Sequence, residues 1–205
     1  MSKRSVIISG GEFSPIEDLS PADFVIACDK GYTYAKRCGI VPDLVVSDFD
    51  SYGGQIDPGI PVNRFQSEKD DTDTMIAIRY AVEHGFDEVL LLCALGGRLD
   101  HALANLQALA YAQTHGLRAT IQAEDTFITS LQNGSLCIPR REGWSLSVFA
   151  VTDRCTGVNI SGAKYPLQDA VVTNCFPFGV SNEWVEDAAE ISVAEGILLI
   201  VLSKL

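Results

Sequence analysis

The sequence predicts an α/β domain with a mainly parallel sheet, followed by a smaller all-β domain. Two observations carry this prediction. In the first half of the chain, short apolar runs alternate with segments of helical periodicity, an order typical of a parallel sheet covered by helices. After about residue 125, helical periodicity stops and short β-rich segments follow one another, separated by glycines. We therefore expect two domains, residues 1–125 and residues 126–205.

The strands of the first domain are predicted mostly from short apolar runs. The run at 89–95 is apolar without interruption, as expected for a strand that is buried on both faces. A parallel sheet of this kind, with helices on both faces, is Rossmann-like. The five predicted strands are residues 6–8, 24–28, 44–46, 89–95 and 118–122.

Three segments between these strands have helical character, and a glycine follows each of them as a stop signal. They are residues 32–38, 72–84 and 99–115. The predicted buried face of the second helix carries Met75, Ile78 and Val82. The predicted apolar stripe of the third helix consists of Leu99, Leu103, Leu106 and Ala110.

The second domain is predicted from β-rich segments at 144–150, 169–175 and 196–202. The sequence Gln-Asn-Gly-Ser at 132–135 is a hairpin signal, because Asn-Gly favours the tight turn between two antiparallel strands. A domain of roughly 80 residues buries a marginal core by itself. We therefore expect it to dock on another domain or to dimerise.

Composition limits the partners and the compartment. A net charge of −12 repels phosphate backbones and anionic lipid, so we expect no nucleic acid and no membrane partner. The same acidity suits a small substrate that arrives with a divalent cation. None of the six cysteines forms a C-x-x-C pair, which favours reduced, buried thiols. The N-terminal apolar stretch is too short to span a membrane and has no signal-peptide cleavage region, so we expect a cytoplasmic protein.

Polar clusters follow several of the predicted strands. Asp29 follows the second strand, Asp48 and Asp50 follow the third, and residues 96–101 follow the strand at 89–95. Residues 69–73 open the second helix. Ligands of open α/β sheets bind outside the carboxyl ends of the strands. The sequence therefore predicts a functional site at this rim.

Asp48 and Asp50 lie two residues apart, so on an extended segment both carboxylates point the same way. Mg²⁺ in proteins is bound by one or two carboxylates together with substrate phosphates and water. Asp73 is placed to reach the same cation. The alternative is an Asp-rich turn, and for a single D-x-D motif that alternative is the commoner one.

Residues near these carboxylates suit a phosphate group. Lys69 and Arg98 supply positive charge, and Gly97 in the Gly96–Gly97 pair allows the backbone to approach an anion. His101 and Asn105 lie one turn apart on the third predicted helix. Each of these residues also has an ordinary structural explanation, as a tight turn or as a local hydrogen-bonding group.

Taken together, the motifs resemble the thiamine pyrophosphokinase (thiamine diphosphokinase) family. The matching pieces are "ACDKG" at 27–31, "PDLVVSDFDS" at 42–51, "KDDTDT" at 69–74, "LGGRLDHALAN" at 95–105 and "GVSNEW" at 179–184. The resemblance implies Mg²⁺-dependent transfer of a diphosphate group from ATP to thiamine, giving AMP and thiamine diphosphate. It also implies an α/β nucleotide-binding catalytic domain at 1–125, a thiamine-binding and dimerisation β-sandwich at 126–205, and a homodimer. Thiamine would lie between the α/β domain of one subunit and the β domain of the other.

Residue by residue, the resemblance implies roles for the polar clusters. Asp48, Asp50 and Asp73 look like the magnesium ligands. The ATP-binding residues would be Asp29, Lys69, Thr72, Gly97, Arg98, His101 and Asn105. Arg98 and Asp100 would take part in catalysis with the three metal ligands, and our own hypothesis is that Asp100 accepts the proton of the thiamine hydroxyl.

The second domain would contribute the thiamine contacts. Ser181 and Asn182 match the segment of the family that forms the thiamine pocket. Tyr165 and Trp184 are candidate flat surfaces for the cationic, aromatic thiamine rings. Trp184 is equally well explained as a core residue of a small β domain.

Two residues depart from the family pattern. Lys30 stands where many members have glycine, and it either contacts a phosphate or faces solvent. Ser47 stands where many members have glycine before D-F-D, and glycine reaches backbone dihedrals that serine avoids. Neither departure removes a predicted ligand.

Three other functions fit parts of the sequence. An aspartate-nucleophile phosphatase would use Asp48, but it needs a later acidic pair at a strand end, which the sequence after Asp125 does not supply convincingly. A catalytically inactive regulator that binds thiamine or a nucleotide would not need the full set of carboxylates, whose mutual repulsion costs stability. A Rossmann dehydrogenase is disfavoured because "SGGEFSP" lacks G-x-G-x-x-G.

Overall fold

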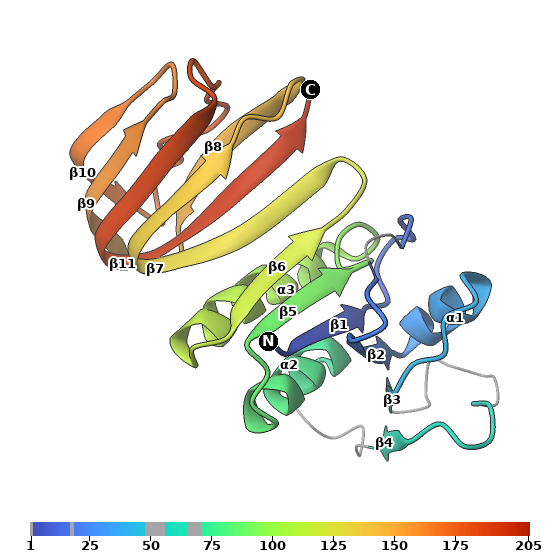
Figure 1. The fold of residues 1–205 in the computed structure, drawn as a ribbon. Helices are drawn as coiled ribbons and strands as arrows, with labels where there is room; N and C mark the ends of the chain where they lie inside the picture. The colour runs from blue at the N-terminus through green and yellow to red at the C-terminus, as the bar shows by residue number, and fades with distance from the viewer. Residues whose placement is uncertain (1, 17–18, 48–55, 65–70) are drawn as a thin grey trace. The chain divides into compact units, whose positions relative to one another are not determined.

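The structure is a computed structural model that describes residues 2–16, 19–47, 56–64 and 71–205 (Figure 1). The chain folds into two compact units, Met1–Glu124 and Asp125–Leu205. Helices occur in the first of these units, and the second is rich in β-strands. The predicted organisation, strands alternating with helices and then a β-rich region, is therefore confirmed.

The first unit contains a sheet in which neighbouring strands run parallel, in the order β6-β5-β1-β2-β3-β4. Its strands are β1 (Arg4–Ile8), β2 (Phe24–Cys28), β3 (Leu44–Ser47), β4 (Val62–Arg64), β5 (Glu88–Leu92) and β6 (Arg118–Gln122). The chain builds outward from β1 in one direction as far as β4 and then crosses to the other side of β1 for β5 and β6. The strand order therefore reverses at β1 and β5, in the middle of the sheet.

The central strands are buried on both faces, as the uninterrupted apolar runs predicted. Val6, Ile7 and Ile8 of β1 are completely buried. The predicted strand at 89–95 is shorter than expected, because β5 ends at Leu92 and Cys93 adopts a φ of 52°. This turn presents the Cys93 carbonyl to the amide of Gly11 at 2.8 Å. A contact with the loop after β1 thus takes the place of further strand pairing.

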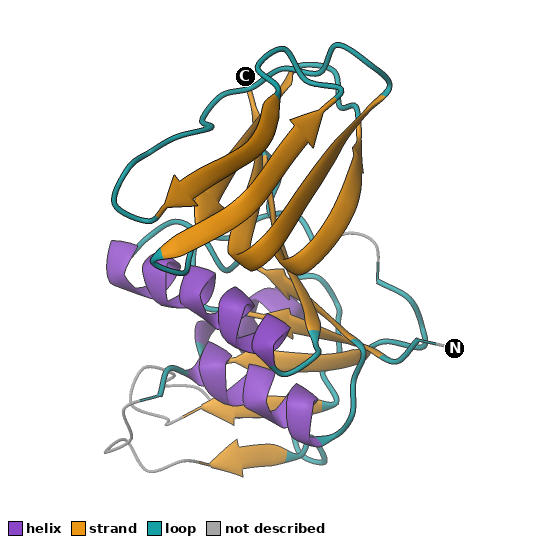
Figure 2. Ribbon diagram, turned by 90° about the vertical axis from the view of Figure 1, so that its left-hand side faces the viewer, coloured by secondary structure: helices purple, strands orange, loops and turns teal. Residues whose placement is uncertain are grey.

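Helices cover both faces of this sheet. They are α1 (Lys30–Arg37), α2 (Asp73–Glu83) and α3 (Leu99–Thr114). Val25 and Ala27 of β2 pack in clusters with side chains of α1. Cys28 points to the opposite face and bonds to the first residue of α2. Helices α2 and α3 lie side by side on this second face (Figure 2).

The buried face of α3 agrees with the predicted stripe at Ala110, which is buried, and differs from it at the leucines. Leu99 and Leu103 are 73% and 54% exposed. The side chains that α3 buries are mainly small ones, and they let the helix approach α2 and β6 closely. They are Asn105, Ala108, Leu109, Ala110 and Ala112. In helix α2 the prediction is confirmed for Ile78, which is buried, whereas Met75 and Val82 are only partly buried. The other buried residues of α2 are Thr74, Ile76, Ala77 and Ala81.

The second unit consists of antiparallel strands. They are β7 (Thr126–Pro139), β8 (Trp144–Ala150), β9 (Arg154–Ser161), β10 (Leu167–Thr173) and β11 (Ala188–Lys204). Strand β11 pairs with β7 along most of its length, with β9 over its first half and with β8 over its second half. One apolar cluster forms the core, and it includes Leu146, Val148, Ile160, Ile191 and Leu198.

The predicted hairpin at 132–135 is wrong, because these residues lie inside the continuous strand β7. Asn133 adopts a φ of 45°, opposite an irregularity of β11 at which the pairing shifts between Val193 and Ile197. The Asn133 side chain accepts a hydrogen bond from the amide of Gly196 at 2.9 Å, and Gly196 itself has a φ of 119°. The extra residues of this irregularity lie in β11, and Asn133 lies opposite them in a left-handed conformation instead of forming a turn.

The structure tests two expectations from the sequence, one about the cysteines and one about membrane-spanning helices. All six cysteines are free thiols, but only Cys28, Cys93 and Cys155 are buried, whereas Cys38, Cys137 and Cys175 are exposed. The expectation that the thiols are buried is therefore wrong for half of them. Of the helices in the described part of the chain, none has the length and apolar character needed to span a membrane.

We expect Gly31→Ala to destabilise the protein. Gly31 is the second residue of α1, and a Cβ added there would lie 2.0 Å from the carbonyl oxygen of Ile8. The backbone would have to move, at a cost of about 1–3 kcal/mol in the free energy of unfolding. Urea denaturation followed by circular dichroism measures this loss. Gly10→Ala is the matched control, because its added Cβ would come no closer than 3.4 Å to another atom. Equal stability of the two variants would contradict the packing argument.

Candidate functional site

A cavity of about 600 Å³ opens at the carboxyl ends of the central strands of the first unit. It lies where the strand order reverses, which is the position at which open α/β sheets bind ligands. Its lining comes from the loops after β1, β2 and β5 and from the starts of α2 and α3. The lining residues are Ser9–Glu12, Cys28–Lys30, Thr72–Thr74, Ala94, Gly96–Arg98, His101 and Asn105.

Each of the three helices begins at this cavity. Lys30 is the first residue of α1, and Thr72 and Arg98 are the capping residues of α2 and α3. The hydroxyl of Thr72 accepts a hydrogen bond from the amide of Met75 at 3.2 Å. The first amides of a helix have no partner within the helix, and the helix dipole adds positive potential at this end. Three such ends around one cavity suit an anion with several oxygens.

Glycines bring the loops after β1 and β5 into close contact. The amides of Gly11 and Glu12 donate to the carbonyls of Cys93 and Leu95, both at 2.8 Å. A Cβ on Gly11 would lie 2.5 Å from the Leu95 carbonyl oxygen, so only glycine fits there. The Glu12 side chain covers Gly96 in the same way, because a Cβ on Gly96 would lie 2.5 Å from the Cβ of Glu12.

Asp29 occupies the turn between β2 and α1 in a strained backbone conformation. Its φ and ψ are 47° and −115°, values that a residue other than glycine seldom adopts. Its amide donates to the carbonyl of Val46 at 2.9 Å, which fixes the turn beside the end of β3. Strain of this kind is commonly found at functional sites, and here it holds a carboxylate residue in the cavity wall.

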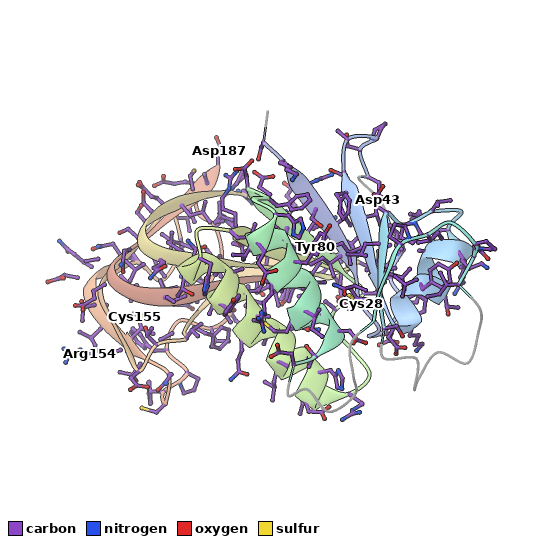
Figure 3. All side chains as sticks on the ribbon, turned by 90° about the horizontal axis from the view of Figure 1, so that it is seen from below. Cys28, Asp43, Tyr80, Arg154, Cys155 and Asp187 are labelled. Carbon is purple, nitrogen blue, oxygen red and sulfur yellow. The ribbon has the colours of Figure 1, made fainter. Side chains whose placement is uncertain are left out.

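Two hydrogen bonds fasten the start of α2 to the sheet. The hydroxyls of Ser9 and Thr74, both buried, lie 2.9 Å apart and share a hydrogen bond. The thiol of Cys28 (labelled in Figure 3) donates to the carbonyl of Asp73 at 3.5 Å. Burial, and then the charges of Asp73 and Asp29, raise the pKa of this thiol well above its usual range, so it remains a neutral donor. The position of Asp73 is therefore set by contacts that the sequence alone does not reveal.

Arg98 and Asp100 form an ion pair at the start of α3. Arg98 Nε donates to Asp100 Oδ1 at 3.1 Å, and Nη2 donates to Oδ2 at 2.5 Å. The amide of His101 also donates to Asp100 Oδ1, at 3.0 Å. The hydrogen bond from Arg98 is the main reason that the pKa of Asp100 falls to about 2. In this arrangement Asp100 is a weak proton acceptor at neutral pH.

The structure brings together most of the predicted ATP-binding residues. Seven predicted site residues line the cavity, and these are Asp29, Thr72, Asp73, Gly97, Arg98, His101 and Asn105. Asp48, Asp50 and Lys69 lie outside the described residues, and their predicted roles stay predictions. In the described ranges, no group of three or more His, Cys, Asp or Glu side chains is arranged to hold a metal ion.

Asn105 has a structural role that the sequence did not reveal. It is buried, and its side-chain amide donates to the carbonyl of Ala94 at 2.7 Å. This bond supports the turn after β5. The cavity residues that sequence reasoning missed include Ser9, Glu12 and Thr74. Ser9 directly follows β1, so the rule that ligands bind beyond strand ends was the signal that could have found this loop.

The four predicted thiamine contacts lie near one another in the second unit. Ala163 forms a β-bridge with Trp184, and the Asn182 side chain accepts from the amide of Tyr165 at 2.9 Å and donates to its carbonyl at 2.8 Å. Tyr165 is 60% exposed, whereas Asn182 is only 3% exposed. Ser181 has a φ of 58°, and its amide donates to the hydroxyl of Ser147.

Trp184 lies in the core of the second unit. It is buried, and its indole N–H donates to the carbonyl of Ile138 at 3.1 Å. This is the structural alternative that the sequence left open for this residue.

Comparison with known proteins matches both units. The family described as "Thiamin pyrophosphokinase, catalytic domain" matches residues 17–121, and "Thiamin pyrophosphokinase, vitamin B1 binding domain" matches residues 135–198. The thiamine pyrophosphokinase of Bacillus subtilis (strain 168) is 28% identical over 207 residues, covering 96% of this chain and 97% of the relative.

Solved structures of this family are similar along the whole chain. The crystal structure of thiamine pyrophosphokinase from Bacillus subtilis has a TM-score of 0.87 at 25% identity, covering 98% of this chain and 99% of that one. The thiamin pyrophosphokinase from Geobacillus thermodenitrificans has a TM-score of 0.85 at 26% identity, covering 98% of this chain and 97% of that one.

We expect Asp100 to titrate near pH 2 and to move up towards its ordinary value of 3.8 in Arg98→Gln, because the ion pair favours the charged carboxylate. Carbon-13 NMR of the aspartate carboxyl carbons measures both midpoints. The pair lowers the pKa in the folded state, so the stability it supplies is present above about pH 4 and is lost as the pH falls towards about 2.

Arg79→Gln is the control for this titration. Arg79 pairs with Asp71, so removing its charge should leave the Asp100 midpoint in place. A wild-type midpoint near 3.8 would show that the Arg98–Asp100 pair does not persist in solution.

Proposed function

This chain belongs to the thiamin pyrophosphokinase family, and from this premise we propose that it transfers the diphosphate group of ATP to the hydroxyl of thiamine, with Mg²⁺, giving thiamine diphosphate and AMP. It is a thiamine diphosphokinase by family. The observation that carries the proposal is that catalytic and vitamin B1 binding segments of the family both match, in order, along one chain. Most of the cavity lies in the catalytic segment.

The finer description of the domains is part of this proposal. We take residues 1–125 as a Rossmann-like nucleotide-binding catalytic domain and residues 126–205 as a β-sandwich that binds thiamine and dimerises. The parallel strand order and the cavity at its reversal support the first assignment. The antiparallel pairing of β7 to β11 and the match to the vitamin B1 binding segment support the second.

The proposed ATP site is the cavity. The triphosphate of ATP carries its charge on oxygens that backbone amides at three helix starts suit well. Thr72, Gly97 and Arg98 are the described residues that we assign to the phosphates, with Lys69 outside the described part. Transfer of a phosphoryl-type group depends mainly on positioning and charge neutralisation, because the protein has little covalent chemistry to perform.

We assign the metal to Asp73 together with Asp48 and Asp50. The donor chemistry fits, because Asp29 and Asp73 line the cavity and carboxylate oxygens are ligands that suit Mg²⁺. When bound, Mg²⁺ would neutralise charge on the phosphate oxygens. The contacts of the Cys28 thiol and of the Thr74 hydroxyl hold Asp73 at this position.

In the proposed reaction, the thiamine hydroxyl oxygen forms a bond to the β-phosphorus of ATP. The bond between the β-phosphorus and the oxygen that bridges it to the α-phosphorus breaks. Its electron pair leaves with AMP, and the hydroxyl proton must leave as well. Asp100 remains our proposed acceptor, on one condition. A phosphate has to draw Arg98 away first, because the bond from Arg98 is what lowers the pKa of Asp100.

We place thiamine against the segments around Tyr165 and Ser181 of the second unit. Tyr165 presents an exposed aromatic ring to a cationic ligand, and the buried amide of Asn182 holds the backbone of Tyr165 on both sides. Trp184 is retained as a candidate contact, although its indole packs in the core.

We also propose a homodimer and a cytoplasmic location. Exposed apolar side chains of the second unit support a dimer, since surfaces of this kind commonly mark protein interfaces. They are Tyr165, Val171, Phe176, Phe178, Val180, Val185 and Leu205. The six free cysteines are consistent with a reducing compartment.

Incubation with Mg·ATP and thiamine tests the proposed function, with AMP and thiamine diphosphate detected by mass. Removal of Mg²⁺ with a chelator should abolish both products. Phosphate on Asp48 without thiamine diphosphate would indicate the aspartate-nucleophile phosphatase instead. Tight binding of thiamine without AMP would indicate the inactive regulator.

We expect Asp73→Asn, and likewise Asp48→Asn, to lower turnover by roughly 10³-fold or more with the fold intact, because each removes a charge that the metal requires. Steady-state kinetics measures the loss, and circular dichroism checks the fold. Asp71→Asn is the matched control, since Asp71 accepts from Arg79 at 2.7 Å and is absent from the described cavity lining. Near-normal turnover of Asp73→Asn would rule out the metal assignment.

A further inference from the structure

Lys30 is a cavity residue whose role the family pattern leaves open. It is the first residue of α1, and it follows Asp29 at the strained turn. Gly10, in the loop after β1, packs against its aliphatic stem, because a Cβ on Gly10 would lie 3.4 Å from the Cβ of Lys30. The Lys30 side chain and this loop therefore belong to the same wall of the cavity.

Tyr34, one helical turn further along α1, holds the Lys30 ammonium. The Nζ atom lies 5.3 Å from the centroid of the Tyr34 ring, within the range of a cation–π contact. The neighbouring Tyr34 hydroxyl is the main reason that the pKa of Lys30 is raised, so the ammonium stays charged. Tyr34 is itself fixed, since it is buried and its hydroxyl donates to the carbonyl of Gly11 at 2.8 Å.

The charges around Lys30 make its ammonium available to an anion. Arg98, the other cation of the described cavity lining, is engaged with Asp100 in two hydrogen bonds. Within the part of the chain that the structure describes, Lys30 makes no ion pair with a carboxylate within 4.0 Å, although the charges of Asp29 and Glu12 act on it. A lysine ammonium binds phosphate as a point charge with three donors.

We propose that Lys30 binds a phosphate oxygen of the nucleotide. In this proposal Tyr34 is the positioning residue, because its ring contacts the Lys30 ammonium and its hydroxyl bonds to the Gly10–Gly11 loop. This inference rests on the proposed function, which places ATP in the cavity. The alternative is that Lys30 only balances the charges of Asp29 and Glu12. In that case its removal would change stability without any preference for a phosphorylated ligand.

Lys30→Met separates these roles, because methionine keeps an unbranched stem and loses the charge. Isothermal titration calorimetry of the full chain with Mg·ATP and with adenosine provides the comparison. We expect ATP affinity to fall about 10- to 100-fold, adenosine affinity to stay the same, and the ATP loss to shrink as salt rises. Lys30→Arg should bind ATP within a few-fold of wild type. Unchanged ATP affinity in Lys30→Met, or an equal loss for ATP and adenosine, would overturn the assignment.

Lys36→Met is the matched control on the same helix. Lys36 lies 5.6 Å from the centroid of the Tyr32 ring and pairs with Asp57 at 2.9 Å, but it is not part of the cavity lining. Lys36→Met also removes one lysine from α1, but it changes no residue of the cavity lining. We expect its ATP affinity to equal that of wild type, and a loss as large as in Lys30→Met would refute a specific contact.

Tyr34→Phe tests the positioning role, since it keeps the ring and removes the hydroxyl that bonds to Gly11. We expect ATP affinity to fall less than in Lys30→Met, with adenosine affinity kept. A lowered melting temperature without any selective loss for ATP would show that Tyr34 is only structural.

The two proposals fail separately. If wild type makes thiamine diphosphate and Lys30→Met binds ATP as tightly as wild type, only the Lys30 assignment fails. If wild type makes no thiamine diphosphate but binds ATP through Lys30, only the proposed function fails.

Discussion

The site depends on the close contact between the loop after β1 and the loop after β5. Two adjacent amides of the first loop bond to carbonyls of the second, and Gly11 leaves no room for a side chain between them. Because β1 and β5 are neighbours at the point where strand order reverses, this contact closes the centre of the sheet's carboxyl edge. The cavity opens beside it, and α1, α2 and α3 all begin there. Sheet topology thus supplies both the place and the positive potential of the site.

The site is held by residues that carry no charge. The Ser9 and Thr74 hydroxyls, the Cys28 thiol and the Tyr34 hydroxyl each bond to a neighbouring segment rather than to solvent. These contacts tie the start of α2 to the ends of β1 and β2, and they tie α1 to the loop after β1. Charged residues such as Asp73 and Lys30 then project from a fixed frame. A frame of this kind reduces the ordering that a ligand must impose when it binds.

Local sequence patterns predicted the order of strands and helices well. They predicted the contacts between distant segments of the chain poorly. The order of strands and helices followed from apolar periodicity, and Asp29, Thr72, Asp73 and Arg98 were found because they follow strands or open helices. Leu99 and Leu103 were misplaced because the alanine face of α3 packs better on its neighbours. The left-handed turn at Cys93 depends on Gly11, about 80 residues away, and no window of sequence contains both. Convergence of Asp48 and Asp50 on Asp73 lies outside the described residues and stays a prediction.

Strand β11 gives the second unit a particular order of assembly. It is the shared neighbour of β7, β9 and β8, and it changes partner near the irregularity at Gly196. During synthesis, β7, β8 and β9 therefore emerge from the ribosome well before the strand that joins them. The first unit is complete by about residue 124. Domains generally fold as units during translation, so newly made chains would pass through a stage in which the first unit is complete and the strands of the second unit still lack their shared partner.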